Sequence, residues 1–544
     1  MRGLMMDAPL LVSGFIEHAA SVHGETEIVA RTLGGGLHRY TYSAAGARCR
    51  RLARALLALG IGEGDRVGSL AWNTHHHFEL FYGVPGIGAV LHTINPRLHD
   101  DTLSFIVNHA DDRWICVDAA TLPIAERLAS RLPGVRGWIY MGKDGEPPRS
   151  TLLNLLSYEA LLARQDSRFD WPRLDEWSAS TICYTSGTTG EPKGVVYSHR
   201  STVLSALFMS TADMIGGYRS GERETVMPIA PLFHANGWQI PFTAPMNGHK
   251  LVLPGRNFEP ERLQELIQSE RVTIAAAVST LWLSLVDFVT TQGLSLAPLR
   301  AALLAGTKAP RTLIEALEQR FGITVGQSWG MTEAPGAVKA TLAPGTLELP
   351  SDAQMSRKLR QGRIGYGTEL RIVDETGTAL PHDGVAVGRL EARGPCVAAA
   401  YLQQQAPVTA GWLSTGDIAR VFSDGSVEIV DRVKDVIKSG GEWISSVAIE
   451  NAALGHPAIQ QAAVIAIDHP RWQERPLLLA VLKPGARLDR DEMIDHLRPQ
   501  IAHWWLPDDV RFVESLPVTA TGKVQKSALR ERYRKVRAEA GRDG

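Results

Sequence analysis

Apolar residues recur at helical spacing in some stretches of the chain and form short unbroken runs in others. Apolar side chains return every three or four positions between residues 43 and 60, which predicts an amphipathic helix that ends at Gly60. Residues 310–321 show the same pattern. Buried strands are predicted at 65–72, 182–184, 250–253 and 301–304. This alternation of strand and helix predicts parallel sheets covered by helices, hence an α/β fold.

The pattern changes after about residue 370. Short β-rich runs at 370–374, 388–392 and 426–430 are separated by Gly and Pro turns, which predicts a small, mainly antiparallel, barrel-like unit. The last hundred residues predict a compact α+β domain, with strands at 462–467, 477–482 and 510–514 and a helix at 491–501. We place the boundary at the charged junction 431–435, between an N-terminal domain 1–430 and a C-terminal domain 436–544.

Composition narrows the function classes. The 544 residues carry a formal net charge of −1, so the basic footprint of a nucleic-acid-binding protein is missing. The four cysteines form no CxxC pair, which argues against a disulfide scaffold or a zinc ribbon. The apolar stretch 272–286 is shorter than the ~20 residues of a membrane span and predicts a strand running into a helix. No secretion signal is recognised, so a cytoplasmic location is expected.

The strongest chemical signal is a loop rich in glycine and hydroxyl groups that follows a predicted strand. Its glycines allow backbone N–H groups to point inward, and its hydroxyls and one lysine add donors for phosphate oxygens. The spacing does not match a Walker A loop. The residues concerned are Thr185, Ser186, Gly187, Thr188, Thr189, Gly190 and Lys193.

Five further motifs follow this loop at 231–238 (PLFHANGW), 329–333 (WGMTE), 414–417 (STGD), 431–435 (DRVKD) and 521–523 (TGK). The six motifs, in this order, resemble the signatures of adenylate-forming enzymes, which include acyl-CoA synthetases, luciferases and nonribosomal adenylation domains. The resemblance covers nearly the whole chain. It is strongest to medium- and long-chain fatty acid–CoA ligases and to 3-methylmercaptopropionyl-CoA ligases.

The resemblance implies a nucleotide site for ATP and Mg²⁺. Thr332 would contact the α-phosphate, while Glu333 and Thr185 would hold the metal. Asp417 would accept the ribose hydroxyls with help from Arg432. The other residues implied around the nucleotide are Ala235, Gly306, Gln327, Ser328 and Trp329, the last at a position where many relatives carry Tyr.

The resemblance also implies two half-reactions in one enzyme. Lys523 would reach the α-phosphate and the substrate carboxylate, and Lys434 would be the hinge of a mobile C-terminal domain. Rotation of that domain would bring coenzyme A contacts from Lys438, Gly440, Gly441 and Trp443. The wall between nucleotide and acid would be formed by His234, Gly237 and Trp238, with Trp238 and Trp443 gating the acyl pocket.

Three functional hypotheses remain open. The first is an ATP-dependent acyl-CoA synthetase for a medium-chain or other mainly apolar carboxylic acid. The second keeps adenylation but passes the acyl group to a carrier protein or to a luciferase-like oxygenation; the amino-acid version is disfavoured, because such domains commonly carry Asp where this chain has His234. The third is a non-catalytic nucleotide-binding scaffold. The relatives are often homodimers, so a homodimer is expected.

Three consecutive histidines, His75, His76 and His77, also suggest a metal site. Consecutive residues on one element point in different directions and rarely converge on one ion. The interpretation favoured by the sequence is therefore a polar helix start, with the metal of the active site being Mg²⁺ held by oxygen ligands.

Overall fold

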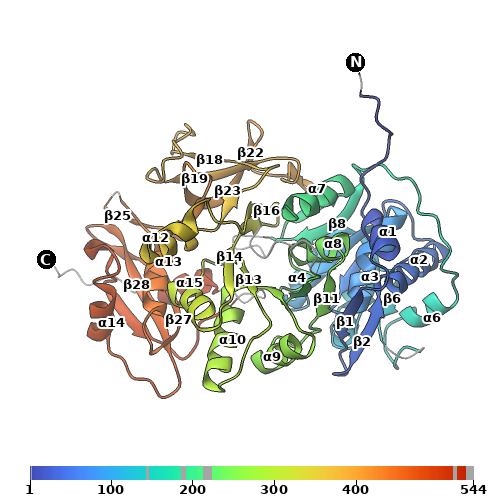
Figure 1. Ribbon diagram of the computed structural model, residues 1–544, viewed down its shortest axis with the longest axis horizontal. Helices are drawn as coiled ribbons and strands as arrows, with labels where there is room; N and C mark the ends of the chain where they lie inside the picture. Colours follow the sequence, from blue (N-terminus) through green and yellow to red (C-terminus); the bar gives the residue numbers. More distant parts are fainter. Residues whose placement is uncertain are drawn as a thin grey trace.

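The computed structural model describes residues 1, 3–142, 146–185, 191–211, 223–440, 442–518 and 524–534. Figure 1 shows the small C-terminal unit at one end of the molecule and the β-rich unit above the two helix-covered sheets. The α/β prediction is confirmed.

Two seven-stranded sheets form the larger part of the molecule, and each is parallel except for one edge pair. The first runs in the order β14 (Thr324–Gln327), β13 (Ala301–Leu304), β12 (Ile274–Ala277), β10 (Thr225–Pro228), β11 (Lys250–Leu253), β1 (Glu27–Arg31), β2 (Leu37–Thr41). The second runs β7 (Leu155–Ser157), β6 (Gly137–Tyr140), β5 (Asp112–Val117), β3 (Arg66–Leu70), β4 (Val90–Ile94), β8 (Ala179–Tyr184), β9 (Gly194–Ser198).

Helices cover these sheets because their apolar faces are buried against the strands. One buried core joins residues of both sheets, for example Leu91 of β4 and Leu251 of β11. The helices are α1 (Ser13–Val22), α2 (Tyr42–Ala58), α3 (His75–Gly83), α4 (Asp100–Ala110), α5 (Leu122–Leu128), α6 (Tyr158–Ala163), α7 (His199–Met209), α8 (Ile240–Met246), α9 (Pro260–Ser269), α10 (Ser279–Thr291) and α11 (Arg311–Glu315).

The predicted antiparallel unit is present. Strands β18 (Glu369–Val373), β19 (Gly388–Arg393), β23 (Trp412–Val421), β22 (Val408–Thr409) and β24 (Val427–Arg432) pair antiparallel. A three-stranded sheet connects this unit to the first large sheet, formed by β15 (Trp329–Met331), β16 (Ala334–Lys339) and β17 (Arg363–Ile364). The remaining elements of this region are α12 (Ser351–Lys358), β20 (Ala400–Tyr401) and β21 (Gln404–Gln405).

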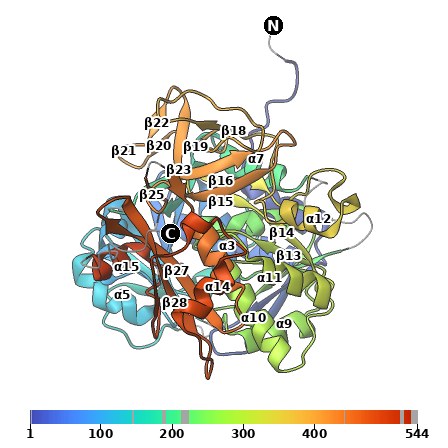
Figure 2. The same cartoon turned by 90° about the vertical axis from the view of Figure 1, so that its left-hand side faces the viewer.

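The C-terminal part is an α+β unit with a buried core on each face of one sheet. Figure 2 shows β27 and β28 of this sheet with α14 and α15. The elements are β25 (Ile437–Ser439), β26 (Glu442–Ile444), α13 (Ser446–Leu454), β27 (Ile459–His469), β28 (Gln473–Leu482), α14 (Arg490–Leu497), β29 (Asp509–Phe512) and α15 (Lys526–Tyr533).

The local predictions agree with these elements, apart from where two helices end. The helix predicted at 491–501 is α14, which ends at Leu497. Residues 310–321 form α11 only to Glu315 and then a π-helical turn, Ala316–Arg320. His75, His76 and His77 begin α3, as predicted, and all three side chains are buried. The four cysteines are free and buried. Among the described residues, no helix has the length and hydropathy needed to cross a membrane.

Candidate active site

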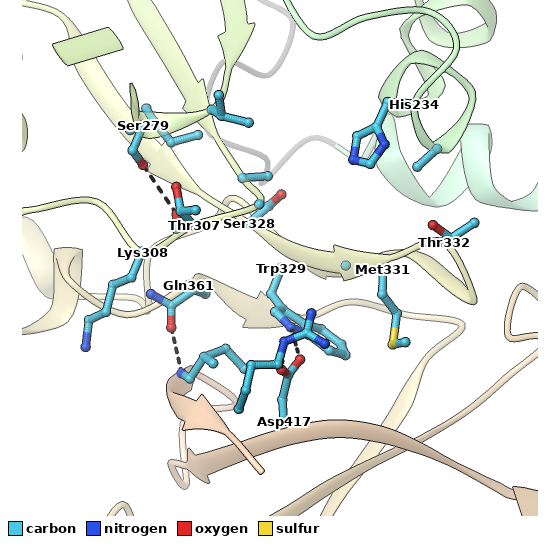
Figure 3. A pocket seen from close by; sticks show the side chains of 18 of the residues that line it. His234, Ser279, Thr307, Lys308, Ser328, Trp329, Met331, Thr332, Gln361 and Asp417 are labelled. Atoms are coloured by element: carbon cyan, nitrogen blue, oxygen red, sulfur yellow. Dashed lines mark hydrogen bonds and ion pairs between the residues drawn. The ribbon is translucent and has the colours of Figure 1, made fainter. Parts of the chain in front are cut away.

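A cavity of about 900 Å³ lies between the larger part of the molecule and the C-terminal unit. Its floor comes from segments that follow β12, β13 and β14, including Val278, Gly306 and Ser328. The carboxyl ends of parallel strands are the usual ligand site of open α/β sheets. Figure 3 shows His234 and Thr332 on one side of this cavity and Trp329 and Asp417 on another.

The two ends of the glycine-rich loop meet at the cavity. Thr185 N donates to Lys193 O over 2.9 Å, and Lys193 N donates to Thr185 Oγ1 over 3.3 Å. Both residues line the cavity. The predicted loop residues Ser186, Gly187, Thr188, Thr189 and Gly190 lie outside the described part of the chain.

Thr332 and Glu333 form the turn between β15 and β16 and face the cavity. Two tyrosines from distant strands fix this turn: Tyr197 Oη donates to Thr332 O, and Tyr401 Oη donates to Glu333 Oε1 over 2.7 Å. The Nζ of Lys193 lies 5.0 Å from the ring centre of Tyr401. Tyr401 therefore contacts both the carboxylate predicted to hold Mg²⁺ and the lysine predicted to contact phosphate, a role that the sequence analysis did not foresee.

Burial keeps Tyr401 a hydrogen-bond donor. It raises the pKa of the phenol, and the bond donated to Glu333 raises that pKa further. Glu333 is only 6% exposed. The Glu333 carboxylate and the Thr185 hydroxyl line the same cavity and are hard oxygen ligands of the kind that suits Mg²⁺, so these residues fit the ion that the resemblance implies.

Asp417 is held from two sides. Trp329 Nε1 donates to Asp417 Oδ2 over 2.9 Å, as Figure 3 shows, and Arg432 Nε lies 2.7 Å from Asp417 Oδ1. Asp417 is 2% exposed and lines the cavity together with both donors. The three residues come from β15, β23 and β24, so the fold brings together positions predicted separately from the STGD, WGMTE and DRVKD motifs.

The predicted adenine residues do not all reach the cavity. Ser328, Trp329 and Gly306 line it, and Gly306 has a φ of +86°. Gln327 is not among the lining residues; its side chain accepts from Ala309 N and donates to Lys358 O, both over 2.8 Å. Gln327 thus braces the backbone beside the cavity.

His234, Ala235 and Trp238 line the cavity from an unusual turn. All five residues from Ala235 to Gln239 have positive φ values, between +37° and +64°. A left-handed conformation costs about 1–3 kcal/mol for a residue other than glycine, so surrounding contacts must hold it. The buried Asn236 provides two of them, donating to Thr181 Oγ1 over 2.6 Å and accepting from Thr93 Oγ1 over 3.2 Å.

Gly237 lies inside this turn and does not line the cavity. A Cβ atom on it would approach Leu232 to 2.9 Å and Pro241 to 3.2 Å. The glycine is therefore required by close packing within the turn, rather than by open space beside Trp238.

Lys434 lines the cavity at the junction between the two parts of the molecule. Burial lowers its pKa. The neighbouring Asp435 is paired with Arg530 of α15 over 2.8 Å. The predicted junction therefore lies against the last described helix.

A second charged network crosses the same junction. Asp431 Oδ2 accepts from Ser446 N over 2.6 Å and from Ser446 Oγ over 2.7 Å. Lys526 Nζ donates to Ser446 Oγ and pairs with Glu450, each over 2.7 Å. Burial raises the pKa of Asp431 and of Glu450. Burial alone would lower the pKa of Lys526, but the negative charges of Glu450 and Asp431 raise it.

The residues predicted to contact coenzyme A lie on the β25–β26 hairpin. Lys438, Gly440 and Trp443 are not among the residues lining the cavity in this arrangement. Gly440 has a φ of +60°, and a Cβ atom there would meet the Trp472 ring at 2.8 Å. Gly441 and Lys523, the predicted adenylation lysine, lie outside the described residues.

The chain is similar to known proteins over nearly its whole length. The family described as AMP-binding enzyme matches residues 16–402, and AMP-binding enzyme C-terminal domain matches residues 448–523. A 3-methylmercaptopropionyl-CoA ligase of Ruegeria pomeroyi is 44% identical over 540 residues, covering 98% of this chain and 99% of the relative. A medium-chain-fatty-acid–CoA ligase of Ectopseudomonas oleovorans is 40% identical over 536 residues, covering 98% of each.

Among solved structures, anthranilate CoA ligase AuaEII in complex with anthranoyl-AMP superposes with a TM-score of 0.84 at 25% identity, covering 97% of this chain and 98% of that one. Both relatives match along almost their full length. The six motifs, the fold and these matches agree: the chain belongs to the AMP-binding enzyme family of adenylate-forming ligases.

Proposed function

We propose that this chain is an ATP-dependent acyl-CoA synthetase for a medium-chain or other mainly apolar carboxylic acid. A carboxylate is a poor electrophile, because its oxygen is a poor leaving group. In the first half-reaction the acid's oxygen attacks the α-phosphorus of ATP and the bond to pyrophosphate breaks. In the second, the thiolate of coenzyme A attacks the carbonyl carbon of the acyl-AMP and AMP leaves.

The observation that carries this proposal is the composition of the cavity. Its polar lining includes Thr185, Lys193, Thr332, Glu333 and Asp417, which supply donors and charges suited to a nucleotide. The lining also includes apolar side chains, among them Val226, Ile240, Ile274, Leu283 and Leu303. A lining of this kind suits an apolar acyl chain whose carboxylate points to the nucleotide.

We assign roles within that cavity as follows. Asp417, fixed by Trp329 and Arg432, accepts the ribose hydroxyls, and Lys193 and Thr332 bind phosphate oxygens. Thr185 and Glu333 would hold Mg²⁺, which when bound neutralises phosphate charge. His234 and Trp238 separate nucleotide from acid.

We also propose that 431–435 is a hinge between domains 1–430 and 436–544, with Lys434 at its centre. Rotation there would bring Lys523 and then the hairpin of Lys438, Gly440, Gly441 and Trp443 to the cavity. The network of Asp431, Ser446 and Lys526 would be remade in each turnover. A homodimer remains a prediction from the family resemblance, and a cytoplasmic location remains a prediction from the sequence.

The direct test is turnover with a graded panel of acids. Protein, ATP, Mg²⁺, coenzyme A and acids of two to sixteen carbons should give AMP, pyrophosphate and acyl-CoA, with a rate that peaks at one chain length. Acyl-AMP that accumulates without consuming coenzyme A, and is then transferred to a phosphopantetheinylated protein, would favour the carrier-loading alternative. ATP binding without AMP release from any acid would favour a scaffold.

The Trp329→Phe substitution tests the ribose contact. It removes the N–H that fixes Asp417 but keeps an aromatic ring. Because hydrogen bonds to charged groups contribute about 1.5–3 kcal/mol, the KM for ATP should rise roughly tenfold or more with kcat changed less. The exposed Trp177 offers a matched control in Trp177→Phe. An unchanged KM for ATP would remove Trp329 from the nucleotide site.

A further inference from the structure

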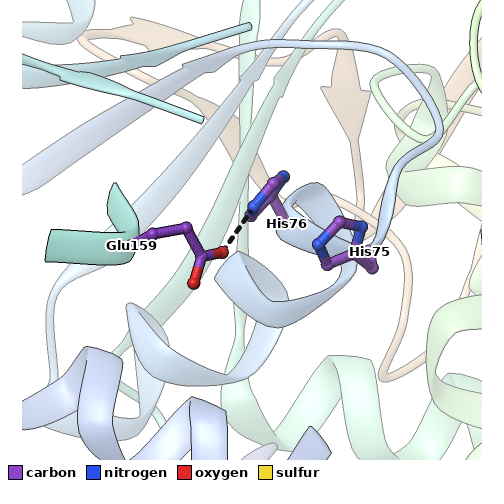
Figure 4. Close-up of side chains that lie close together, drawn as sticks. All are labelled: His75, His76 and Glu159. Carbon is purple, nitrogen blue, oxygen red and sulfur yellow. Dashed lines mark hydrogen bonds and ion pairs between the residues drawn. The ribbon is translucent and has the colours of Figure 1, made fainter. Parts of the chain in front are cut away.

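Outside the active-site cavity, a buried cluster of histidines lies where α3 meets α6. The ring centre of His75 is 3.8 Å from that of His76 and 3.8 Å from that of His38 on β2. His76 Nε2 lies 2.9 Å from Glu159 Oε1 on α6. Figure 4 shows His75, His76 and Glu159 gathered in one small volume, and none of them lines the active-site cavity.

The third histidine of the run has a different role. His77 contacts Ser69 Oγ and Trp72 O, each over 3.1 Å, and is fully buried. His77 therefore braces the start of α3 against β3, whereas His75 and His76 turn toward Glu159.

The cluster has unused coordinating capacity. His75 is 5% exposed, and its Nδ1 has no hydrogen-bond partner within the described part of the chain; the same holds for His38 Nε2. One ligand atom each from His75, His76 and Glu159 lie within 4.8 Å of one another. A buried imidazole nitrogen without a partner is costly unless something fills the site.

Arg48 fixes the two carboxylates beside the cluster. Arg48 donates to both oxygens of Glu159, over 2.7 and 3.0 Å, and to Glu79 over 2.7 Å. The Glu159 carboxylate is thereby held in a fixed orientation beside His76.

We propose that His75, His76 and Glu159 form a binding site for a divalent transition-metal ion of the Zn²⁺ class. Two imidazoles and one carboxylate suit Zn²⁺ better than Mg²⁺, and water completes the fourth position. The metal takes the place between His76 Nε2 and Glu159 Oε1, and the proton on Nε2 moves to Nδ1 or to solvent.

The surroundings supply the other requirements of a metal site. Arg48 orients the carboxylate from behind, and the Tyr158 ring packs edge-on against His76 with centres 4.9 Å apart. The Glu159 side chain is 26% exposed, which provides an entry path. Ligand atoms at a tetrahedral zinc lie roughly 3.3 Å apart. Binding would therefore move His76 Nε2 and Glu159 Oε1 apart from 2.9 Å, and it would bring the other ligand atoms, which lie within 4.8 Å of one another, closer by up to about 1.5 Å. The ion would cross-link α3 to α6.

The test is metal retention by the full chain. After equilibration with Zn²⁺ and dialysis, elemental analysis should find about one Zn²⁺ per chain, Co²⁺ should give the visible absorption of a tetrahedral site, and Zn²⁺ should raise the Tm. His76→Gln keeps the Arg48–Glu159 pair and should weaken Zn²⁺ binding at least tenfold, as should Glu159→Gln. Both are compared as folded proteins by circular dichroism without metal.

His18→Gln is the matched control, because the exposed His18 also lies beside a histidine, His23, with ring centres 5.3 Å apart. It should leave retention unchanged. The proposal is overturned if the wild-type chain retains no Zn²⁺ and gives no tetrahedral Co²⁺ spectrum, or if His76→Gln and Glu159→Gln retain as much Zn²⁺ as wild type.

Discussion

Lys523→Ala is expected to lower the rate of acyl-AMP formation by about 10²–10³-fold while leaving ATP binding nearly intact. The lysine's charge is needed where negative oxygens of the carboxylate and the α-phosphate crowd together in the transition state. In the proposed mechanism the nucleotide is held by residues of the larger part of the molecule that line the cavity, such as Asp417 and Thr332. Pyrophosphate release measured beside equilibrium ATP binding separates the two effects.

The second half-reaction provides a further test of this prediction. Lys523→Ala supplied with synthetic acyl-AMP and coenzyme A should still form acyl-CoA, because the leaving group is then already in place. Lys483→Ala is the matched control, since Lys483 is an exposed lysine of the same unit that does not line the cavity. If Lys523→Ala impairs both half-reactions equally, or neither, the two-step assignment fails.

Short-range pattern was a good guide to the elements. The runs 250–253 and 301–304 coincide with β11 and β13, because an unbroken apolar run between polar residues has few alternatives to a buried strand. The end of α11 was not foreseen, because the switch to a π-helical turn at Ala316 leaves the apolar spacing unchanged. The positive φ values from Ala235 to Gln239 had no local signal apart from Gly237.

Contacts between segments that are distant in the chain could not be predicted from the sequence. Tyr401 and Glu333 lie 68 positions apart and meet only because β20 packs beside the turn between β15 and β16. The histidine cluster needs His38 from β2 and Glu159 from α6, whereas the run His75–His77 alone argues against convergence. Motifs thus predicted candidate site residues, while the fold decides which neighbours orient them.

Glu333→Gln is expected to lower the adenylation rate by about 10²-fold and to raise the Mg²⁺ concentration needed for half-maximal activity. Glutamine keeps the size of the side chain but loses the negative charge that would bind the metal. The measurement is initial rate against free Mg²⁺ at saturating ATP. The exposed Glu348 provides the control variant Glu348→Gln, which should behave as wild type.

Tyr401→Phe distinguishes a role in metal binding from simple packing. Phenylalanine keeps the ring that Lys193 approaches at 5.0 Å but removes the hydroxyl that donates to Glu333. If that hydroxyl orients the carboxylate toward the metal, the Mg²⁺ concentration needed for half-maximal activity should rise roughly tenfold, in the same direction as for Glu333→Gln. The double variant should then lose little more activity than Glu333→Gln alone. Tyr366→Phe, at a tyrosine 84% exposed, serves as control. A lowered Tm with an unchanged Mg²⁺ dependence would mean that Tyr401 only supports the turn, and the carboxylate would then owe its orientation to the backbone of β15 and β16.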